Sequence, residues 1–251
     1  MLLVDLIEST RAPERRHPWE RARFAFFREV LGSARLDADG MTFLDVGAGD
    51  GWFARQVAAT APGVAVLCWD IGYDAAELAP AMGAGGAVRF TPARPDGLFD
   101  VVLLLDVLEH VPEDRAFLTD LVATNLRPGG RLLLSVPAWR CLFSSHDERL
   151  RHHRRYTPGD CRRLLASAGV EIERAGGLFH SLLPARALLA SAERVKVARR
   201  QRHAGEWSAP PRLTRLVERL LEWDTAFSLA ASARGWEVPG LSWWALCRRS
   251  S

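Results

Sequence analysis

The stretch that decides the fold is FLDVGAGDG, residues 43–51, in which a short apolar run passes directly into a glycine-rich loop. A helical pattern follows from Trp52 to Ala59 and stops before Pro62 and Gly63. Strand, glycine loop and helix in this order indicate a ligand-binding turn at the carboxyl edge of a parallel sheet, because glycines let a ligand approach the backbone closely.

Four more apolar runs repeat the strand pattern along the chain, over residues 64–69, 88–91, 99–105 and 131–136. They show no polar alternation, which is typical of strands in a parallel sheet whose two faces are both covered. Helical patterns over Pro112–Asn125 and Pro158–Ala168 alternate with them. The alternation predicts a doubly wound α/β sheet.

The remaining segments extend this core at both ends. The apolar spacing of Trp19–Ala34 predicts a lead-in helix, Val170–Ala175 alternates like an outer strand, and Leu241–Cys247 predicts a last strand. Between these two strands, Leu182–Arg199 and Leu213–Ala233 are predicted helices of an insertion. We therefore expect one domain, divided into a helical lead-in (1–40), a core (41–176), a helical cap (177–240) and a last strand (241–251).

Composition excludes several classes of protein. With 251 residues, 48% of them hydrophobic, the chain can build a core and is not mainly disordered. A net charge of +3 does not by itself force nucleic-acid or membrane binding. The four cysteines lie far apart without CxxC spacing, and the first residues lack signal-peptide features, so we expect reduced thiols and a cytoplasmic location.

The glycine loop also indicates its ligand. A dinucleotide fingerprint needs a glycine at position 52, where this chain has Trp52. Asp70 ends the next strand, 23 residues beyond Gly47, where it can accept hydrogen bonds from ribose hydroxyls. Asp45 and Asp50 suit positive charge better than a pyrophosphate. These features favour S-adenosylmethionine as the cofactor, and a tight turn without a ligand is the alternative.

Four segments, FLDVGAGDG, LCWDIG, FDVVLLLDVLEHV and LRPGGRLLLSVP, resemble in order and spacing the motifs of class I S-adenosylmethionine-dependent methyltransferases. They span residues 41–138, and HDERLRHHRRYTPGDCRRLLASAGVE resembles the continuation in a bacterial small-molecule subgroup, of type 11/12. The resemblance implies a Rossmann-like, mostly parallel seven-stranded sheet, with an N-terminal helix and a helical cap inserted before the last strand.

The resemblance also implies the cofactor site. Asp70 would hold the ribose, Ile71 would face adenine, and Asp106 would stand near the methionine moiety. The segment after the third strand, residues 90–94, departs from the family's usual acid and small residue, so an adenine contact there is not implied. The full expected set is Asp45, Gly47, Ala48, Gly49, Asp50, Asp70, Ile71, Asp106 and Val107.

Histidines are the candidates for a proton acceptor, because their pKa lies near neutrality. His146 and His152 follow the fifth strand, at the ligand-binding edge of the sheet, and His110 follows the fourth. The alternative is that the segment around His146 forms a structural hydrogen-bonded loop. A metal site is disfavoured, because His152 adjoins His153 and Asp147 adjoins His146, which is poor geometry for coordination from one element.

The acceptor is expected to be a small or lipid-linked molecule, methylated at oxygen rather than nitrogen, in natural-product or glycoconjugate biosynthesis. An anionic acceptor is one candidate. The fourth strand is not followed by the Asn/Asp-Pro-Pro-Tyr/Phe pattern of amino-methylating nucleic-acid enzymes, so no specific nucleic acid is expected. Arginines after the fifth strand can clamp an anion. The expected substrate-binding residues are Arg154, Arg155, Tyr156, His17 and Trp19.

Three roles remain open for the cap: a lid on the active site, which we favour, a dimer interface, or peripheral contact with a membrane. The protein is expected to be a monomer or a homodimer. Two alternatives to a methyltransferase remain as well. One is a non-catalytic S-adenosylmethionine-binding partner subunit, and the other is a nicotinamide-dependent oxidoreductase.

Overall fold

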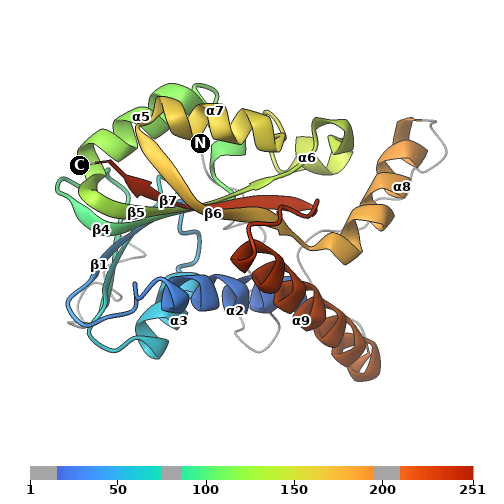
Figure 1. The fold of residues 1–251 in the computed structure, drawn as a ribbon, viewed down its shortest axis with the longest axis horizontal. Coiled ribbons are helices and arrows are strands. Elements are labelled where there is room, and N and C mark those ends of the chain that lie inside the picture. The colour runs from blue at the N-terminus through green and yellow to red at the C-terminus, as the bar shows by residue number, and fades with distance from the viewer. Residues whose placement is uncertain (1–15, 75–85, 195–209, 251) are drawn as a thin grey trace.

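A seven-stranded sheet with helices on both faces organises the part of the chain that the structure, a computed structural model, describes: residues 16–74, 86–194 and 210–250 (Figure 1). The strand order is β3-β2-β1-β4-β5-β7-β6. Strand β7 runs antiparallel to both of its neighbours, β5 and β6, and the other pairs are parallel. The strands are β1 (Thr42–Val46), β2 (Ala65–Trp69), β3 (Val88–Thr91), β4 (Phe99–Leu105), β5 (Leu126–Pro137), β6 (Val170–Leu178) and β7 (Ser242–Arg249).

The sheet confirms the expected fold class, and it places the switch in strand order between β1 and β4. Both strands are buried almost completely, with Leu44, Val102 and Leu103 at or near zero exposure. Chains that leave these two strands pass to opposite faces of the sheet, so a crevice opens beyond their carboxyl ends. The glycine loop after β1 and Asp106 after β4 both lie at this crevice.

Two helical layers cover the sheet. On one face lie α2 (Pro18–Ser33), α3 (Trp52–Thr60) and α9 (Pro211–Ala233), and on the other lie α5 (Asp114–Asn125) and α7 (Pro158–Ser167) (Figure 1). The lead-in helix buries Phe26 and Phe27 edge-on against Trp244 of β7. The N-terminal helix is therefore part of the core.

Two strands are longer than the sequence indicated. The segment Leu126–Gly130, which we interpreted as a helix breaker before a strand, is the first part of β5, and Leu126 pairs with Phe99. Strand β6 continues from Ala175 to Leu178, because β7 supplies an antiparallel partner along its whole length. Gly176 and Gly177 lie in this part of β6, where they pair with Trp244 and Trp243 of β7, the single neighbour of this edge strand.

The predicted insertion leaves and rejoins the sheet at one point. A Cβ atom on Gly177 would lie 2.2 Å from the carbonyl oxygen of Val238, and one on Gly240 would lie 2.3 Å from the backbone nitrogen of Leu178. The two chain segments thus pass backbone against backbone. Between them lie a short 3-10 turn (His180–Leu182), α8 (Leu183–Arg194) and α9, and the end of the predicted helix 182–199 lies outside the described residues.

The two helices of the insertion differ in how they pack. One face of α9 is buried beside α2 and β6, through residues such as Leu221 and Ser228, and Glu218 of α9 forms an ion pair with Arg21 of α2 at 2.6 Å. Asp224 accepts hydrogen bonds from the backbone of His180 and Ser181. This face of α9 is thus packed against the core, whereas α8 extends from one side of the molecule (Figure 1).

Two further features bear on the earlier expectations. No helix among the described residues is long and apolar enough to cross a membrane. All four cysteines are free thiols, and burial raises the pKa of Cys68, Cys161 and Cys247.

Candidate active site

A cleft of about 440 Å³ opens at the carboxyl edge of the sheet, over the glycine loop. Its walls come from the start of α2, the ends of β1, β4 and β5, and the short helix α6 (Ser145–Arg149). Of the residues expected to bind the cofactor, Ala48, Gly49, Asp50 and Asp106 line it directly. Segments far apart in the sequence therefore share one cavity.

The glycine loop needs its glycines for two physical reasons. Gly47 and Gly51 both have positive φ, +65° and +69°, which side chains rarely adopt. A Cβ atom on Gly47 would lie 2.8 Å from Val107, and one on Gly51 would lie 2.4 Å from the ring of Phe90. Val107, expected near the cofactor, thus packs beneath the loop as a buried support.

Asp70 ties the loop to the end of β2. It is 1% exposed, its Oδ2 accepts a hydrogen bond from the Gly49 backbone at 3.1 Å, and its Oδ1 accepts one from Gly72 at 2.8 Å. Burial raises its pKa, while the two backbone hydrogen bonds oppose that shift. The carboxylate is thus held in a fixed orientation at the place where a ribose is expected.

Asp45 lies behind the loop, on β1. Burial raises its pKa to about 7, the nearby positive charge of Arg23 opposes this shift, and the charge of Asp70 adds to it. Its Oδ2 is buried and has no hydrogen-bond partner. A buried carboxylate in this state favours the arrival of a positive charge nearby, which fits the ammonium and sulfonium groups of S-adenosylmethionine.

Asp106 stands at the end of β4 in a strained conformation. Its φ is +58°, which is uncommon for a residue other than glycine and is found most often at functional sites. Ser135 donates a hydrogen bond to its Oδ1 at 3.0 Å, and Arg23 of α2 forms an ion pair with Oδ2. The strain is held in place because neighbours on two other elements fix the side chain.

Helix α2 covers one side of the cleft with charged and aromatic side chains. Arg16 pairs with Asp50 of the loop and lies 5.1 Å from the ring centre of Trp52. The guanidinium carbon of Arg23 lies over the ring of Trp19, 4.6 Å from the ring centre. The expected substrate residues His17 and Trp19 both line the cleft, and His17 also caps α2 by accepting a hydrogen bond from the Trp19 backbone.

A smaller apolar hollow of about 180 Å³ lies beside the cleft. It is lined by Ile71, Trp69, Val111, Pro112 and Phe117 together with Val46 and His110. Ile71 is 47% exposed and follows Asp70 directly. The hollow is thus an apolar surface next to the expected ribose position, as a flat aromatic base requires.

Three histidines form the opposite wall of the cleft, as expected from the sequence. His110, His146 and His152 all line it. Burial lowers the pKa of His110 and of His146 to about 4, and the neighbouring His152 ring and the Arg186 guanidinium respectively add to these shifts. His110 and His146 are therefore neutral at physiological pH and have a nitrogen lone pair to offer.

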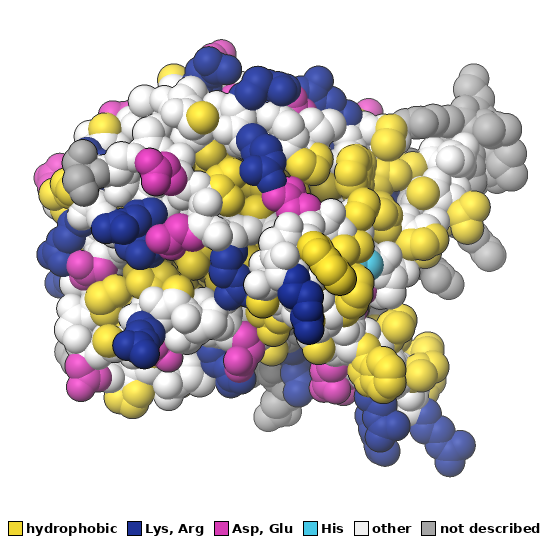
Figure 2. Space-filling model, in the orientation of Figure 1, with side chains coloured by type: hydrophobic (Ala, Val, Ile, Leu, Met, Phe, Trp, Pro, Cys, Tyr) yellow, Lys and Arg dark blue, Asp and Glu magenta, His cyan; other side chains and the backbone are white. Residues whose placement is uncertain are grey.

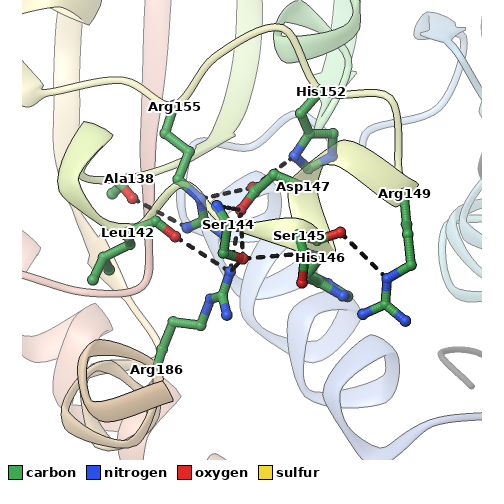
Figure 3. A network of polar contacts seen from close by, with 10 residues as sticks. All are labelled: Ala138, Leu142, Ser144, Ser145, His146, Asp147, Arg149, His152, Arg155 and Arg186. Atoms are coloured by element: carbon green, nitrogen blue, oxygen red, sulfur yellow. Dashed lines mark hydrogen bonds and ion pairs between the residues drawn. The ribbon is translucent and has the colours of Figure 1, made fainter. Parts of the chain in front are cut away.

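A buried aspartate fixes this wall (Figure 3). Asp147 is 0% exposed, and its Oδ1 contacts Nδ1 of His152 at 3.0 Å and accepts a hydrogen bond from Arg155 at 2.7 Å. Its Oδ2 accepts hydrogen bonds from the Ser144 backbone at 3.0 Å and from Arg186 of α8 at 3.1 Å. These partners hold the pKa of Asp147 well below its usual range, although burial opposes them.

Two roles were considered for the loop that carries His146 and His152: a structural hydrogen-bonded loop and a source of the catalytic base. Ser144 and Asp147 form a reciprocal capping box at the start of α6, so this loop does have a structural hydrogen-bond network. His146 and His152 nevertheless face the cleft. The contact from Arg186 also shows that α8 braces the loop, which is the part of the cap that meets the active site.

Two expected substrate residues lie elsewhere. Arg154 and Tyr156 line a second hollow on the α5 and α7 side, and only Arg155 reaches both this hollow and the cleft. Tyr156 donates hydrogen bonds to the Leu108 carbonyl and to Asp114. Arg154 and Tyr156 are therefore not among the residues that line the cleft.

Several residues of the cleft were not predicted from the sequence. Glu20 and Arg23 of α2 and Arg16, two residues before that helix, were not expected there, although their neighbours His17 and Trp19 were. Glu109 also lines the cleft, beside His110. The place of Glu109 could have been predicted, because β4 and β5 are parallel neighbours and the residues that directly follow them meet at one edge of the sheet.

Comparison with known proteins agrees with this geometry. Residues 16–175 match a family model described as a methyltransferase domain. A ubiquinone biosynthesis O-methyltransferase from Xanthomonas oryzae pv. oryzae is 34% identical over 113 residues, which cover 41% of this chain and 46% of that protein. The chain spans about half the length of the curated relatives it matches.

Solved structures share the fold. A sarcosine dimethylglycine methyltransferase homologue from Galdieria sulphuraria is 16% identical, with a TM-score of 0.56 over 91% of this chain and 85% of that one. The [4+2]-cyclase SpnF is 18% identical, with a TM-score of 0.57 over 99% and 93%. Since a cyclase shares this fold too, the fold by itself does not decide the reaction.

Proposed function

Since the chain belongs to the methyltransferase domain family, as the class I resemblance indicated, we propose that it transfers a methyl group from S-adenosylmethionine to a hydroxyl oxygen of a small or lipid-linked acceptor. The observation that carries this proposal is the single cleft in which the glycine loop and Asp106 face three histidines. The O-methyltransferase relative supports oxygen as the acceptor atom.

The residues present fit the cofactor. Asp70 would accept hydrogen bonds from the ribose, and the apolar hollow beside Ile71 would receive the adenine. Asp45 and Asp106 would stabilise the positive groups, and Arg23 would pair with the carboxylate. Bound there, S-adenosylmethionine supplies an electrophilic methyl group.

The protein's own contribution is alignment and proton removal. A hydroxyl group must lose its proton as its oxygen attacks the methyl carbon, and a positioned nitrogen base accelerates such a step about 10²–10⁴-fold. His152 suits this role, because its contact with Asp147 orients the ring. The wall of histidines is where we place the acceptor's hydroxyl group.

Two measurements test the proposed function. Titration calorimetry should show binding of S-adenosylmethionine, with none for NAD. Labelled methyl groups should then pass from S-adenosylmethionine to components of a membrane-lipid extract, and the His152→Ala variant should bind the cofactor normally but transfer far more slowly. Binding without any transfer would favour the non-catalytic partner subunit, and absence of binding would defeat both.

Cofactor binding is expected to depend on pH through Asp45. Its pKa of about 7 means that the carboxyl group is mostly protonated at pH 6 and mostly ionised at pH 7.5. Only the ionised form attracts the positive cofactor, so affinity should rise with pH and should be about tenfold weaker at pH 6 than at its plateau. Calorimetry at both pH values measures this, and Asp45→Asn should bind weakly with no such slope. An equal slope in that variant would assign the titration to another group.

An exposed apolar stripe indicates how a lipid-linked acceptor could reach the cleft. Figure 2 shows hydrophobic side chains together with Lys or Arg at the projecting end of α9. We define the arm stripe as the exposed apolar residues of α8 and α9, among which Trp223 is 79% and Leu188 is 73% exposed. Its members are Leu188, Leu189, Leu213, Leu216, Leu220, Trp223 and Phe227.

The positive charges beside the arm stripe indicate which kind of surface it would bind. Arg212, Arg215 and Arg219 each precede a stripe leucine and are exposed, while Glu218 is engaged by Arg21. An apolar stripe flanked by arginines fits the surface of an anionic membrane, in which the helix lies in the interface. Because Arg186 of α8 also braces the catalytic loop, docking would place the cleft close to the lipid surface.

Removing the stripe should abolish membrane association. Each large apolar side chain that leaves water contributes about 1.5–3 kcal/mol. The double variant Leu216→Glu, Trp223→Glu should therefore bind vesicles containing phosphatidylglycerol roughly a hundredfold more weakly or worse. Co-sedimentation measures this, with Leu98→Glu, exposed elsewhere on the surface, as the control. A wild-type protein that stays unbound at low salt would contradict the membrane proposal.

A further inference from the structure

Two segments of the cleft wall bring three side chains that can bind a metal together. Glu109 and His110 belong to the 3-10 turn after β4 (Leu108–His110), and His152 follows α6. One ligand atom from each residue lies within 4.8 Å of the others, and all three residues line the cleft. The rings of His110 and His152 meet edge to face, with centres 4.7 Å apart.

Each histidine has one ring nitrogen engaged, which leaves the other for a ligand. Nδ1 of His152 lies 3.0 Å from the Asp147 carboxylate, so its Nε2 faces away from that contact. His110 hydrogen-bonds to the backbone of Arg151 through one nitrogen, and its buried Nδ1 has no hydrogen-bond partner. A buried nitrogen lone pair without a partner is costly unless a ligand uses it.

The surroundings of His152 resemble the outer shell of metal sites in general. Histidines that bind a metal usually donate their other ring nitrogen to a carboxylate, which fixes the ring and strengthens it as a ligand. Asp147 occupies this position, and Arg155 and Arg186 hold Asp147 in turn. The chain also turns sharply just before His152, since Arg151 has a φ of +59°. That strain is consistent with a ring held for a purpose.

From this geometry we propose that Glu109, His110 and His152 bind one divalent metal ion of the zinc type, on which the acceptor's oxygen completes the coordination. This inference rests on the proposed function and adds to it the group that activates the acceptor. Sequence reasoning disfavoured a metal because it considered neighbours within one element. The present set instead comes from two segments that fold together.

The donor set selects the kind of ion. Two imidazoles and one carboxylate with an open position are typical of catalytic zinc and related transition metals. Magnesium prefers oxygen ligands in a nearly ideal octahedron. A positive ion would also stabilise the fully buried carboxylate of Glu109.

In the reaction, the ion would lower the pKa of the acceptor's hydroxyl group. That hydroxyl releases its proton to water at the mouth of the cleft, and its oxygen forms a bond to the methyl carbon. The carbon–sulfur bond of S-adenosylmethionine breaks, and its electron pair stays on sulfur, which yields S-adenosylhomocysteine. The methylated ether oxygen binds the ion less strongly than the alkoxide did, which favours product release.

The test is direct metal binding to protein stripped with a chelator. Titration calorimetry with Zn²⁺ should show one tight site and with Mg²⁺ none, and Co²⁺ should give the visible absorbance of a protein-bound ion. Asp147→Asn removes an outer partner of the site, so its affinity for Zn²⁺ should fall about ten- to hundredfold. Glu109→Gln and His152→Ala remove ligands, so each should lose more affinity than that. His153→Ala, exposed and adjacent, is the matched control and should bind as the wild type does.

The outcomes separate this proposal from the proposed function. If the wild type binds no Zn²⁺, or if Glu109→Gln and His152→Ala bind it as well as His153→Ala does, the metal site is refuted. Methyl transfer that continues unchanged in chelator, with normal cofactor binding, also refutes the metal site but leaves the proposed function standing with His152 as a direct base. Failure to bind S-adenosylmethionine refutes the function whatever the metal result.

Discussion

Replacing Asp147 by alanine is expected to lower the free energy of unfolding by about 3–5 kcal/mol, as is typical when one partner of a buried ion pair is removed. The carboxylate is fully buried and joins Arg155, Arg186 and His152. Its loss would leave positive groups buried without a counter-charge. Since small proteins are stable by only about 5–15 kcal/mol, the variant should unfold at a much lower urea concentration.

The chain contains a matched control for this prediction. Asp160 also completes a capping box, with Thr157 at the start of α7, and it also pairs with arginines, Arg140 and Arg163. Those two arginines are largely exposed. Asp160→Ala should therefore cost only about 1 kcal/mol, the usual value for a lost cap. Equal urea midpoints for the two variants, measured with chelator present, would show that burial of the Asp147 network does not stabilise the fold.

Replacing Asp70 by alanine is expected to weaken binding of S-adenosylmethionine roughly a hundredfold. Hydrogen bonds to a charged group contribute about 1.5–3 kcal/mol each, and a loss of about 3 kcal/mol corresponds to that factor. The variant loses the acceptor for the ribose hydroxyls. It also leaves the Gly49 and Gly72 backbone amides without the carboxylate that now holds the loop.

Two comparisons make the Asp70 result specific. S-adenosylhomocysteine lacks the sulfonium charge but keeps the ribose, so its affinity should fall by the same factor in calorimetry. Asp96→Ala removes an exposed carboxylate elsewhere and should leave both affinities unchanged. Binding by Asp70→Ala within threefold of the wild type would show that Asp70 does not hold the ribose.

Much of the fold could be predicted from the sequence because its signals are local. The apolar run of β4 was predicted over Phe99–Leu105, the bounds found in the structure. Pro158 and Thr157 marked the start of α7 in the same way. The start of β5 was not predicted, because Arg127-Pro-Gly-Gly has the pattern of a helix breaker. This segment belongs to the strand because Leu126 pairs with Phe99 of β4, a contact that is distant in the sequence.

The cap shows where local signals end. Its second helix was predicted closely, while its role as a lid stays a prediction. Arg186 of α8 contacts Ser144 and Asp147 in the loop that carries His146 and His152. The apolar stripe of a helix does not say which surface will cover it. In α9 the face that carries Leu221 and Ser228 is buried where the helix packs on α2 and β6, while Leu216 and Trp223 stay exposed.

The sequence by itself determined the order of strands and helices along the chain, the glycine loop after β1 and the acid that follows β2. Glycine content, apolar runs and spacing along the chain encode these features directly. Only the tertiary structure decided that Arg23 meets Asp106 across 83 residues, that Arg186 meets Asp147, and that Glu109 and His110 face His152. Such contacts depend on how α2 crosses the sheet and how loops fold over its edge, and no period in the sequence records those distances.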